Sequence, residues 1–176
     1  MKKSIPAIAL GLAALLGAQA IAATQSASSL AGAFINAGGG PGSFSTVRAF
    51  DAMIGDTALQ AELSTIKSRS TTQARDQFVR VFDFAMSDAW QRAGQDNVSV
   101  PDSTQSGLDL AKALYNAGMQ GGAFSGEAFF NTLFTARVWT DVSHDIDAKF
   151  GAGTSATFAG NVGAMFTDLQ SQVSSR

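Results

Sequence analysis

The residues best suited to chemistry lie in one stretch of the sequence, Phe124 to Phe150. This stretch holds the only histidine of the chain, His144, with Asp141 three residues before it and Asp147 three residues after it. Residues three apart share one face of a helix, so either carboxylate could orient the imidazole or favour its charged form. Such a group is a candidate general base, metal ligand or pH switch. The simpler alternative is an exposed histidine on a solvated acidic face, and we adopt it as the working hypothesis.

Metal binding is not expected from this stretch. A structural zinc site needs three or four cysteine or histidine ligands, and the chain has no cysteine and one histidine. The alternating oxygen-bearing residues from Asp141 to Asp147 resemble the start of a calcium-binding loop. However, Ile146 stands where such a loop has glycine, and Ala152 stands where it has glutamate. We therefore predict no metal site.

Neither covalent hydrolysis nor nucleotide binding is indicated by a motif. The chain has no cysteine nucleophile, no Gly-x-Ser-x-Gly sequence and one possible histidine base. Residues 151–156 imitate a dinucleotide-binding loop, but they follow a helical pattern, and that motif requires a preceding strand. A small enzyme using His144 with Asp141 or Asp147 is kept as an alternative, and a non-catalytic protein is the favoured expectation.

Aromatic and small residues supply the other candidates for a binding site. The chain has 13 phenylalanines and five methionines, against one tyrosine and two tryptophans. A core of this kind can leave a pocket for an apolar ligand, and small residues in the last helical pattern would let a flat ligand approach closely. The alternatives are a completely filled core and a tight helix crossing. The candidate ligand-binding residues are Tyr115, Phe130, Phe134, Trp139, Phe158, Gly160 and Gly163.

The N-terminus has the pattern of a secretory signal peptide over residues 1–22. The basic pair Lys2-Lys3 precedes an apolar run from Ile5 to Leu16 and Ala-x-Ala sequences at 18–20 and 20–22. A retained membrane anchor is the alternative, but the apolar run is shorter than the roughly 20 residues that span a bilayer. The chain has no cysteine for lipid attachment. We therefore expect a bacterial protein that is cleaved after the signal, is periplasmic or secreted, and makes no stable membrane insertion.

The rest of the chain has the length of one domain. We expect a short helix and a glycine-rich linker at 23–43, followed by a helical domain at 44–176. Loss of Lys2 and Lys3 with the signal leaves ten of the twelve basic residues against fourteen acidic ones, a net charge near −4. Nucleic-acid and anionic-membrane partners require a basic surface, so neither is expected. The oligomeric state is left open.

Helical periodicity dominates the sequence after residue 30. Apolar residues recur at three- and four-residue steps, and only 98–100 alternates as a strand would. We predict an all-α, single-domain, orthogonal or irregular bundle of about six helices with no significant sheet, and a flexible link at 119–123. Phe124 and Ser125 suggest a hydrophobic staple and an N-cap. The apolar face then rotates along the stretch that follows, which predicts a curved helix or a break near Thr140–Asp141.

The order of the expected helices resembles that of the truncated globins. Gly39-Gly40 before the first amphipathic helix and Gly55-Asp56 after it carry the resemblance. It implies a haem-binding histidine before the final two helices, but the corresponding region, Thr104–Met119, contains none. Haem held by the standard histidine ligation is therefore not expected.

The favoured functional hypothesis is an exported, non-catalytic cell-envelope protein. It would bind a partner protein or a small apolar ligand through its Phe- and Met-rich helical core. The alternatives are a globin-like or other cofactor-binding protein, a small enzyme built on His144, and a structural or interaction protein with no small-molecule ligand.

Overall fold

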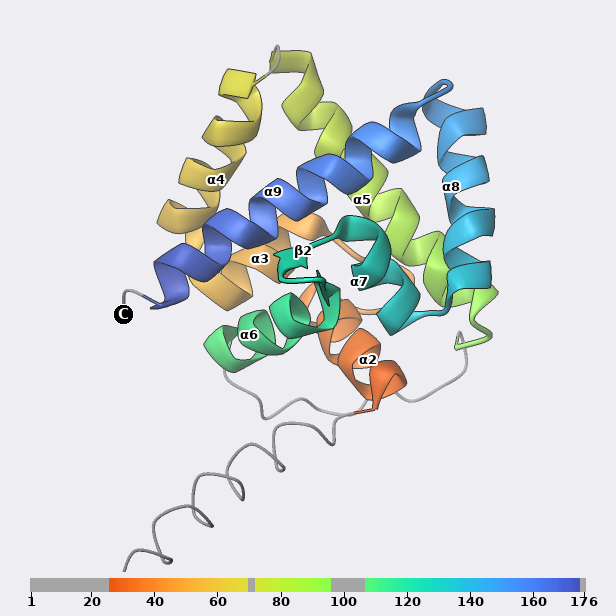
Figure 1. Cartoon of the computed structure of the whole chain (residues 1–176), viewed down its shortest axis with the longest axis horizontal. Helices are drawn as coiled ribbons and strands as arrows, with labels where there is room; N and C mark the ends of the chain where they lie inside the picture. The colour runs from red at the N-terminus through yellow and green to blue at the C-terminus, as the bar shows by residue number, and fades with distance from the viewer. Residues whose placement is uncertain (1–25, 70–71, 96–106, 175–176) are drawn as a thin grey trace, which may run out of the picture.

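The structure, a computed structural model, describes residues 26–69, 72–95 and 107–174. These residues form eight helices and one short hairpin (Figure 1), which confirms the all-α fold without a significant sheet. The expected number of about six helices was wrong, because Gly55 and the Phe134–Thr135 junction each divide a long helical stretch in two. The helices are α2 (Ala27–Ala37), α3 (Thr46–Ile54), α4 (Asp56–Arg69), α5 (Thr72–Arg92), α6 (Gly107–Gly118), α7 (Gly126–Leu133), α8 (Ala136–Phe150) and α9 (Thr154–Ser174).

Two features expected from the sequence lie outside the described residues. They are the signal peptide at 1–22 and the alternating segment at 98–100. Within the part of the chain that is described, no helix combines the length and the apolar character needed to cross a membrane.

Phenylalanine rings form the centre of the core. Phe34 of α2 has four other rings at centroid distances of 5.5 to 6.1 Å, among them Phe50 of α3, Phe82 of α5 and Phe129 of α7. Phe34, Phe50, Phe82 and Phe129 are each 0% exposed. Aromatic pairs of this kind contribute about 0.5–1.5 kcal/mol each beyond the area that they bury. The short first helix, α2, is therefore packed into the same core as the helices that follow it.

A carboxylate from α5 holds the start of α3. Thr46, the first residue of α3, is 1% exposed. Its backbone N–H and its hydroxyl both donate to Asp83 Oδ1, each at 2.6 Å. The preceding residue, Ser45, is the N-cap of α3, and its side chain accepts from the N–H of Arg48. Asp83 thus joins two helices whose contact residues are 37 positions apart.

The long central stretch is broken, but not where the sequence suggested. α7 ends at Leu133 and α8 begins at Ala136, whereas α8 runs without interruption through Thr140–Asp141. The break therefore comes earlier than predicted. It lets the buried face of α7 and the buried face of α8, which carries Trp139, both pack on the core. Thr135 in the junction has φ 122° and ψ 155°, and it is the only non-glycine residue with positive φ among the described residues.

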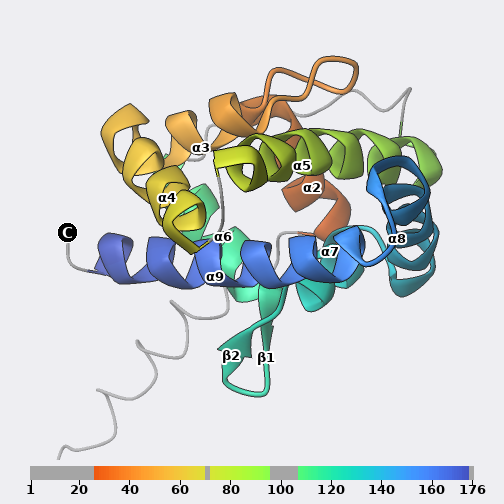
Figure 2. The ribbon, with the colours of Figure 1, turned by 90° about the horizontal axis from the view of Figure 1, so that it is seen from above.

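The predicted flexible link at 119–123 is instead an antiparallel hairpin. Strand β1 (Met119–Gln120) pairs with β2 (Ala123–Phe124), and the hairpin projects from the body of the molecule (Figure 2). Gly121 and Gly122 have φ of 59° and 86°. Two successive residues with positive φ make the type I′ turn that matches the twist of a hairpin, and glycine adopts it without strain.

The start of α7, directly after the hairpin, has the N-cap and the hydrophobic staple predicted from the sequence. Ser125 is the N-cap of α7, and its hydroxyl accepts from the N–H of Ala128. The rings of Phe124 and Phe129 lie 5.9 Å apart across this cap. Both features are confirmed.

Candidate functional site

A pocket of about 240 Å³ lies between α5 and the start of α9. Figure 1 shows α9 beginning next to the end of α8 and then crossing in front of α5. The apolar part of the pocket is made by Phe78, Val81 and Phe158, which are 3%, 1% and 2% exposed. The rings of Phe78 and Phe158 lie 5.7 Å apart, so one ring from each helix fixes this surface. We call this site the α5–α9 pocket; its residues are Gln77, Phe78, Val81, Ala152, Gly153, Thr154, Thr157, Phe158 and Asn161.

The remaining side chains of the α5–α9 pocket are polar but uncharged. Gln77 and Asn161 bring one carboxamide from each helix, and Thr154 and Thr157 bring hydroxyl groups. The hydroxyl of Thr157 donates to the carbonyl of Gly153 at 3.2 Å. Carboxamides can both donate and accept hydrogen bonds. The arrangement places an aromatic surface beside a few orienting polar groups, which is the usual composition of a small-molecule site.

Asp147 closes the junction between α8 and α9. Gly151 and Gly153, with φ of 110° and 80°, turn the chain from one helix into the next. The Oδ1 atom of Asp147 accepts from the backbone N–H of Ser155 at 2.8 Å. This bond is the main cause that holds the pKa of the Asp147 carboxyl below its ordinary value. The positive end of α9 is thus matched by a carboxylate of the protein itself.

The same geometry decides between two interpretations of residues 151–156. These residues form a break before a capped helix, and α8 rather than a strand precedes them. One of the amides that a phosphate-binding loop would offer is already bonded to Asp147. The dinucleotide-binding interpretation therefore lacks the preceding strand that it requires. The Ser155 amide is also not free to bind a phosphate, because it is bonded to Asp147.

His144 lies on the exposed side of α8 and is not among the residues that line the α5–α9 pocket. It makes a small contribution to the lowered pKa of Asp147, behind the bonds from the start of α9. The Asp147 carboxylate is engaged in holding α9. A catalytic role for His144 with Asp147 stays a hypothesis that the geometry does not favour.

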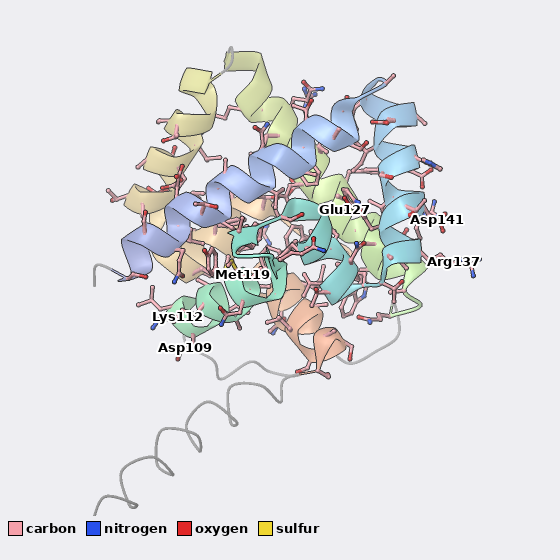
Figure 3. All side chains as sticks on the ribbon, in the orientation of Figure 1. Asp109, Lys112, Met119, Glu127, Arg137 and Asp141 are labelled. Carbon is pink, nitrogen blue, oxygen red and sulfur yellow. The ribbon has the colours of Figure 1, made fainter. Side chains whose placement is uncertain are left out.

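Asp141, the other proposed partner of His144, belongs to a charge cluster around Arg92. The Arg92 guanidinium lies 2.9 Å from Asp88 on the same helix and 3.8 Å from Asp141 on α8, and it also pairs with Asp145. Figure 3 shows Asp141 on the outer edge of α8. Burial raises the pKa of Asp88 above its ordinary value despite Arg92, and the nearby Asp145 adds to this. The cluster ties α5 to α8.

The described residues contain no group of three or more histidine, cysteine or acidic side chains placed to hold a metal ion. Arg92 occupies the centre of the one acidic cluster described above, so its carboxylates are matched by an internal cation.

The seven residues predicted to bind a ligand do not form one site. Phe130 is stacked on Trp139 at 4.7 Å, and it also contacts the rings of Phe134 and Phe158. All four are buried, so most of this set fills the core. Tyr115 stacks on Phe124 beside the hairpin. Of the seven, Phe158 alone belongs to the α5–α9 pocket.

Gly160 and Gly163 lie on a different surface, an open groove between α9 and the start of α7. A Cβ on Gly126 of α7 would lie 2.3 Å from the carbonyl oxygen of Ala159, so here the two backbones touch. Gly163 faces the same contact, with the carbonyl of Phe124 at 3.5 Å from an added Cβ. A Cβ added at Gly160 would have no other atom within 4 Å. Gly126 and Gly163 therefore allow the close contact between α7 and α9, whereas Gly160 faces the open part of the groove.

Comparisons with protein families, curated proteins and solved structures found no match for the chain. The resemblance to truncated globins accordingly stays a sequence-based hypothesis. A functional proposal has to rest on the geometry of the sites themselves.

Proposed function

We propose that the chain is an exported, non-catalytic binding protein of the cell envelope, and that the α5–α9 pocket takes a small, uncharged and largely apolar molecule. One observation carries the proposal. The pocket places two aromatic rings and a valine from separate helices against four polar side chains, none of which is ionisable. The signal-like N-terminus supports the exported location.

The volume of the pocket sets the size of the ligand. A cavity of about 150 Å³ in another protein accommodates benzene, and sites for drug-sized molecules start at about 300 Å³. At about 240 Å³, the α5–α9 pocket suits a single ring with a short substituent. The carboxamides of Gln77 and Asn161 favour a hydroxyl or carbonyl group on that ring, because they can bond to either.

The uncharged lining of the α5–α9 pocket favours an uncharged ligand over an ionised one. A buried charge without a partner is strongly disfavoured, and the pocket lining contains no side chain of either charge. The start of α9 would normally attract an anion. Here its positive end already faces the Asp147 carboxylate, which would repel a second negative group.

The proposal is tested by titrating the purified protein with benzyl alcohol and, separately, with benzoate. At a concentration of ten times Kd, a ligand that binds only the folded state stabilises it by about 1.4 kcal/mol. For a domain of this size that raises Tm by about 4 °C. Benzyl alcohol should produce this shift, and benzoate should not.

A matched pair of variants locates the effect. Thr157 on the pocket and Thr140 on α8 are both exposed, and each hydroxyl donates to the carbonyl four residues earlier. Thr157→Phe places a ring in the pocket and should abolish the benzyl alcohol shift, whereas Thr140→Phe should keep it. Equal shifts in the two variants, or no shift in the wild type, would overturn the proposal.

A second function, binding of another protein, is favoured by the projecting hairpin. Met119 at its base is 36% exposed and lies on the same face as Glu127 of the α9–α7 groove (Figure 3). If this face binds a second copy of the chain, sedimentation should show concentration-dependent association that Met119→Ser weakens. Association that Met119→Ser leaves unchanged would exclude the hairpin from the interface.

A further inference from the structure

The contact between α5 and α8 places three carboxylates around one guanidinium. Arg92 of α5 lies 2.9 Å from Asp88 on its own helix and 3.8 Å from Asp141 on α8, and it also pairs with Asp145. The Asp88 side chain is 17% exposed, whereas the other three are 35% to 45% exposed. When all four groups are ionised, the contact therefore has excess negative charge, and Asp88 is the carboxylate that water screens least.

The neighbouring helices bring no further cation to this cluster within the described part of the chain. The ammonium group of Lys149 on α8 lies 4.4 Å from the ring centre of Phe84, where a cation–π contact holds it. Arg137 lies near the start of α8 at its outer edge (Figure 3) and forms no ion pair with the cluster. The two other helices packed against α8 are α7 and α9, and the one charged residue of each is acidic, Glu127 and Asp168.

A proton on Asp88 would change repulsion into attraction across this contact. Asp88 and Asp145 lie close enough for a hydrogen bond between their carboxyl groups, and a protonated carboxyl can donate to a carboxylate. Burial raises the pKa of Asp88 and the nearby Asp145 raises it further, whereas Arg92 opposes the change. Asp88 is therefore protonated at a higher pH than an ordinary carboxyl group.

We infer that the contact between α5 and α8 is a pH-sensitive latch, in which Asp88 and Asp145 repel each other at neutral pH and share a proton in mild acid. A carboxyl whose pKa is raised by folding adds stability as the pH falls through the folded-state pKa toward the ordinary value of 3.8. Asp147, at the other end of α8, acts in the opposite direction, because its pKa is lowered. The latch holds α8 on α5 whether or not the α5–α9 pocket binds a ligand.

Urea unfolding of the purified protein at pH 7 and pH 4 tests the latch, since urea does not screen charges. At pH 7, Asp88→Asn should unfold at a higher urea concentration than the wild type, because the substitution removes the repulsion. At pH 4 this gain should shrink, because the wild type then has the shared proton. In an Asp145→Asn background, Asp88→Asn should no longer raise the midpoint at pH 7. An ordinary surface ion pair predicts the reverse, since loss of a partner of Arg92 would lower the midpoint.

Two control variants and a local probe complete the test. Asp76→Asn, at an exposed carboxylate of α5, should shift the midpoint equally at both pH values, and His144→Ala should keep the pH effect of the wild type. Trp139 of α8 is 7% exposed and stacks on Phe130. Hydrogen exchange of its indole N–H, corrected for the intrinsic rate, should slow from pH 7 to pH 4 in the wild type but not in Asp88→Asn.

Three results would overturn the inference. They are an Asp88→Asn variant that is less stable than the wild type at pH 7, a gain that is equal at both pH values, and loss of the pH effect in His144→Ala.

Discussion

Removal of the Asp83 carboxylate should release the start of α3 and destabilise the whole domain. Thr46 is 1% exposed, and both of its donors bond to Asp83 Oδ1 at 2.6 Å. Asp83→Ala would leave these donors buried without a partner. Loss of a hydrogen bond to a charged acceptor costs about 1.5–3 kcal/mol. Because two donors share one oxygen, we expect a loss of about 3 kcal/mol, a large part of the roughly 5–15 kcal/mol that stabilises a typical domain.

Smaller changes at the same contact should cost less. Asp83→Asn keeps a neutral acceptor and should cost about 1 kcal/mol. Thr46→Val removes the hydroxyl but keeps the backbone donor, and it should also cost about 1 kcal/mol. The double variant Asp83→Ala with Thr46→Val should cost less than the sum of its parts, because both single changes remove the same hydroxyl bond.

Unfolding in guanidinium chloride measures these differences as shifts of the midpoint at constant slope. Asp76→Ala is the control, since Asp76 is an exposed carboxylate on the same helix. Its effect should stay within about 0.5 kcal/mol. If Asp83→Ala changes the free energy of unfolding no more than this control, the contact between α3 and α5 does not stabilise the fold as described.

Three further predictions concern the junctions of α8. Thr135 has a backbone conformation that only glycine adopts without strain of about 1–3 kcal/mol. Thr135→Gly should therefore raise the free energy of unfolding by about 0.5 kcal/mol. Thr135→Ala keeps the strain and loses the cap, so it should lower the free energy of unfolding by about 1 kcal/mol. Unfolding in denaturant measures both differences. The lowered pKa of Asp147 adds stability above the ordinary carboxyl pKa near 3.8, and this contribution is lost as the pH falls through the folded-state pKa. Asp147→Asn should thus be less stable than the wild type at pH 7 by an amount that shrinks below pH 4, and equal differences at both pH values would contradict the contact with Ser155. His144→Ala should change neither the benzyl alcohol shift nor the free energy of unfolding by more than about 0.5 kcal/mol, and loss of ligand binding in calorimetry would give His144 a function.

Local signals in the sequence predicted the helix boundaries well. Ser125 was predicted as an N-cap because a hydroxyl in the position before a helix bonds to an early N–H, a rule that needs no tertiary structure. Gly55, at φ 82°, ends α3 for a similarly local reason. Asp88 and Arg92, four residues apart on one helix, pair for an equally local reason.

The break at Phe134–Thr135 had no such signal. It contains neither glycine nor proline, and Thr135 adopts an unfavourable conformation. The cause is tertiary, because Phe134 and Trp139 both pack against Phe130 and a straight helix would carry one of them out of the core. The rotation of the apolar face did indicate a change of direction, but the position was wrong because periodicity does not show which neighbour each residue meets.

The candidate sites depended on contacts that sequence spacing cannot show. Only Phe158 of the α5–α9 pocket was a predicted ligand residue, and its partner Phe78 is 80 positions away on α5. Asp141 was expected beside His144, whereas the structure pairs it with Arg92 from another helix. Prediction was sound where a motif acts within one helix, and it failed where two helices build a surface together.

Binding of a small uncharged ring in the α5–α9 pocket can be observed at the residues of the pocket themselves. The most direct measurement is of nuclear Overhauser effects between benzyl alcohol protons and protein methyl groups in the purified protein. We expect contacts to the Val81 methyl groups and to the Phe158 ring, and we expect both to be lost in Thr157→Phe. Contacts confined to other parts of the protein, or none at saturating ligand, would contradict it.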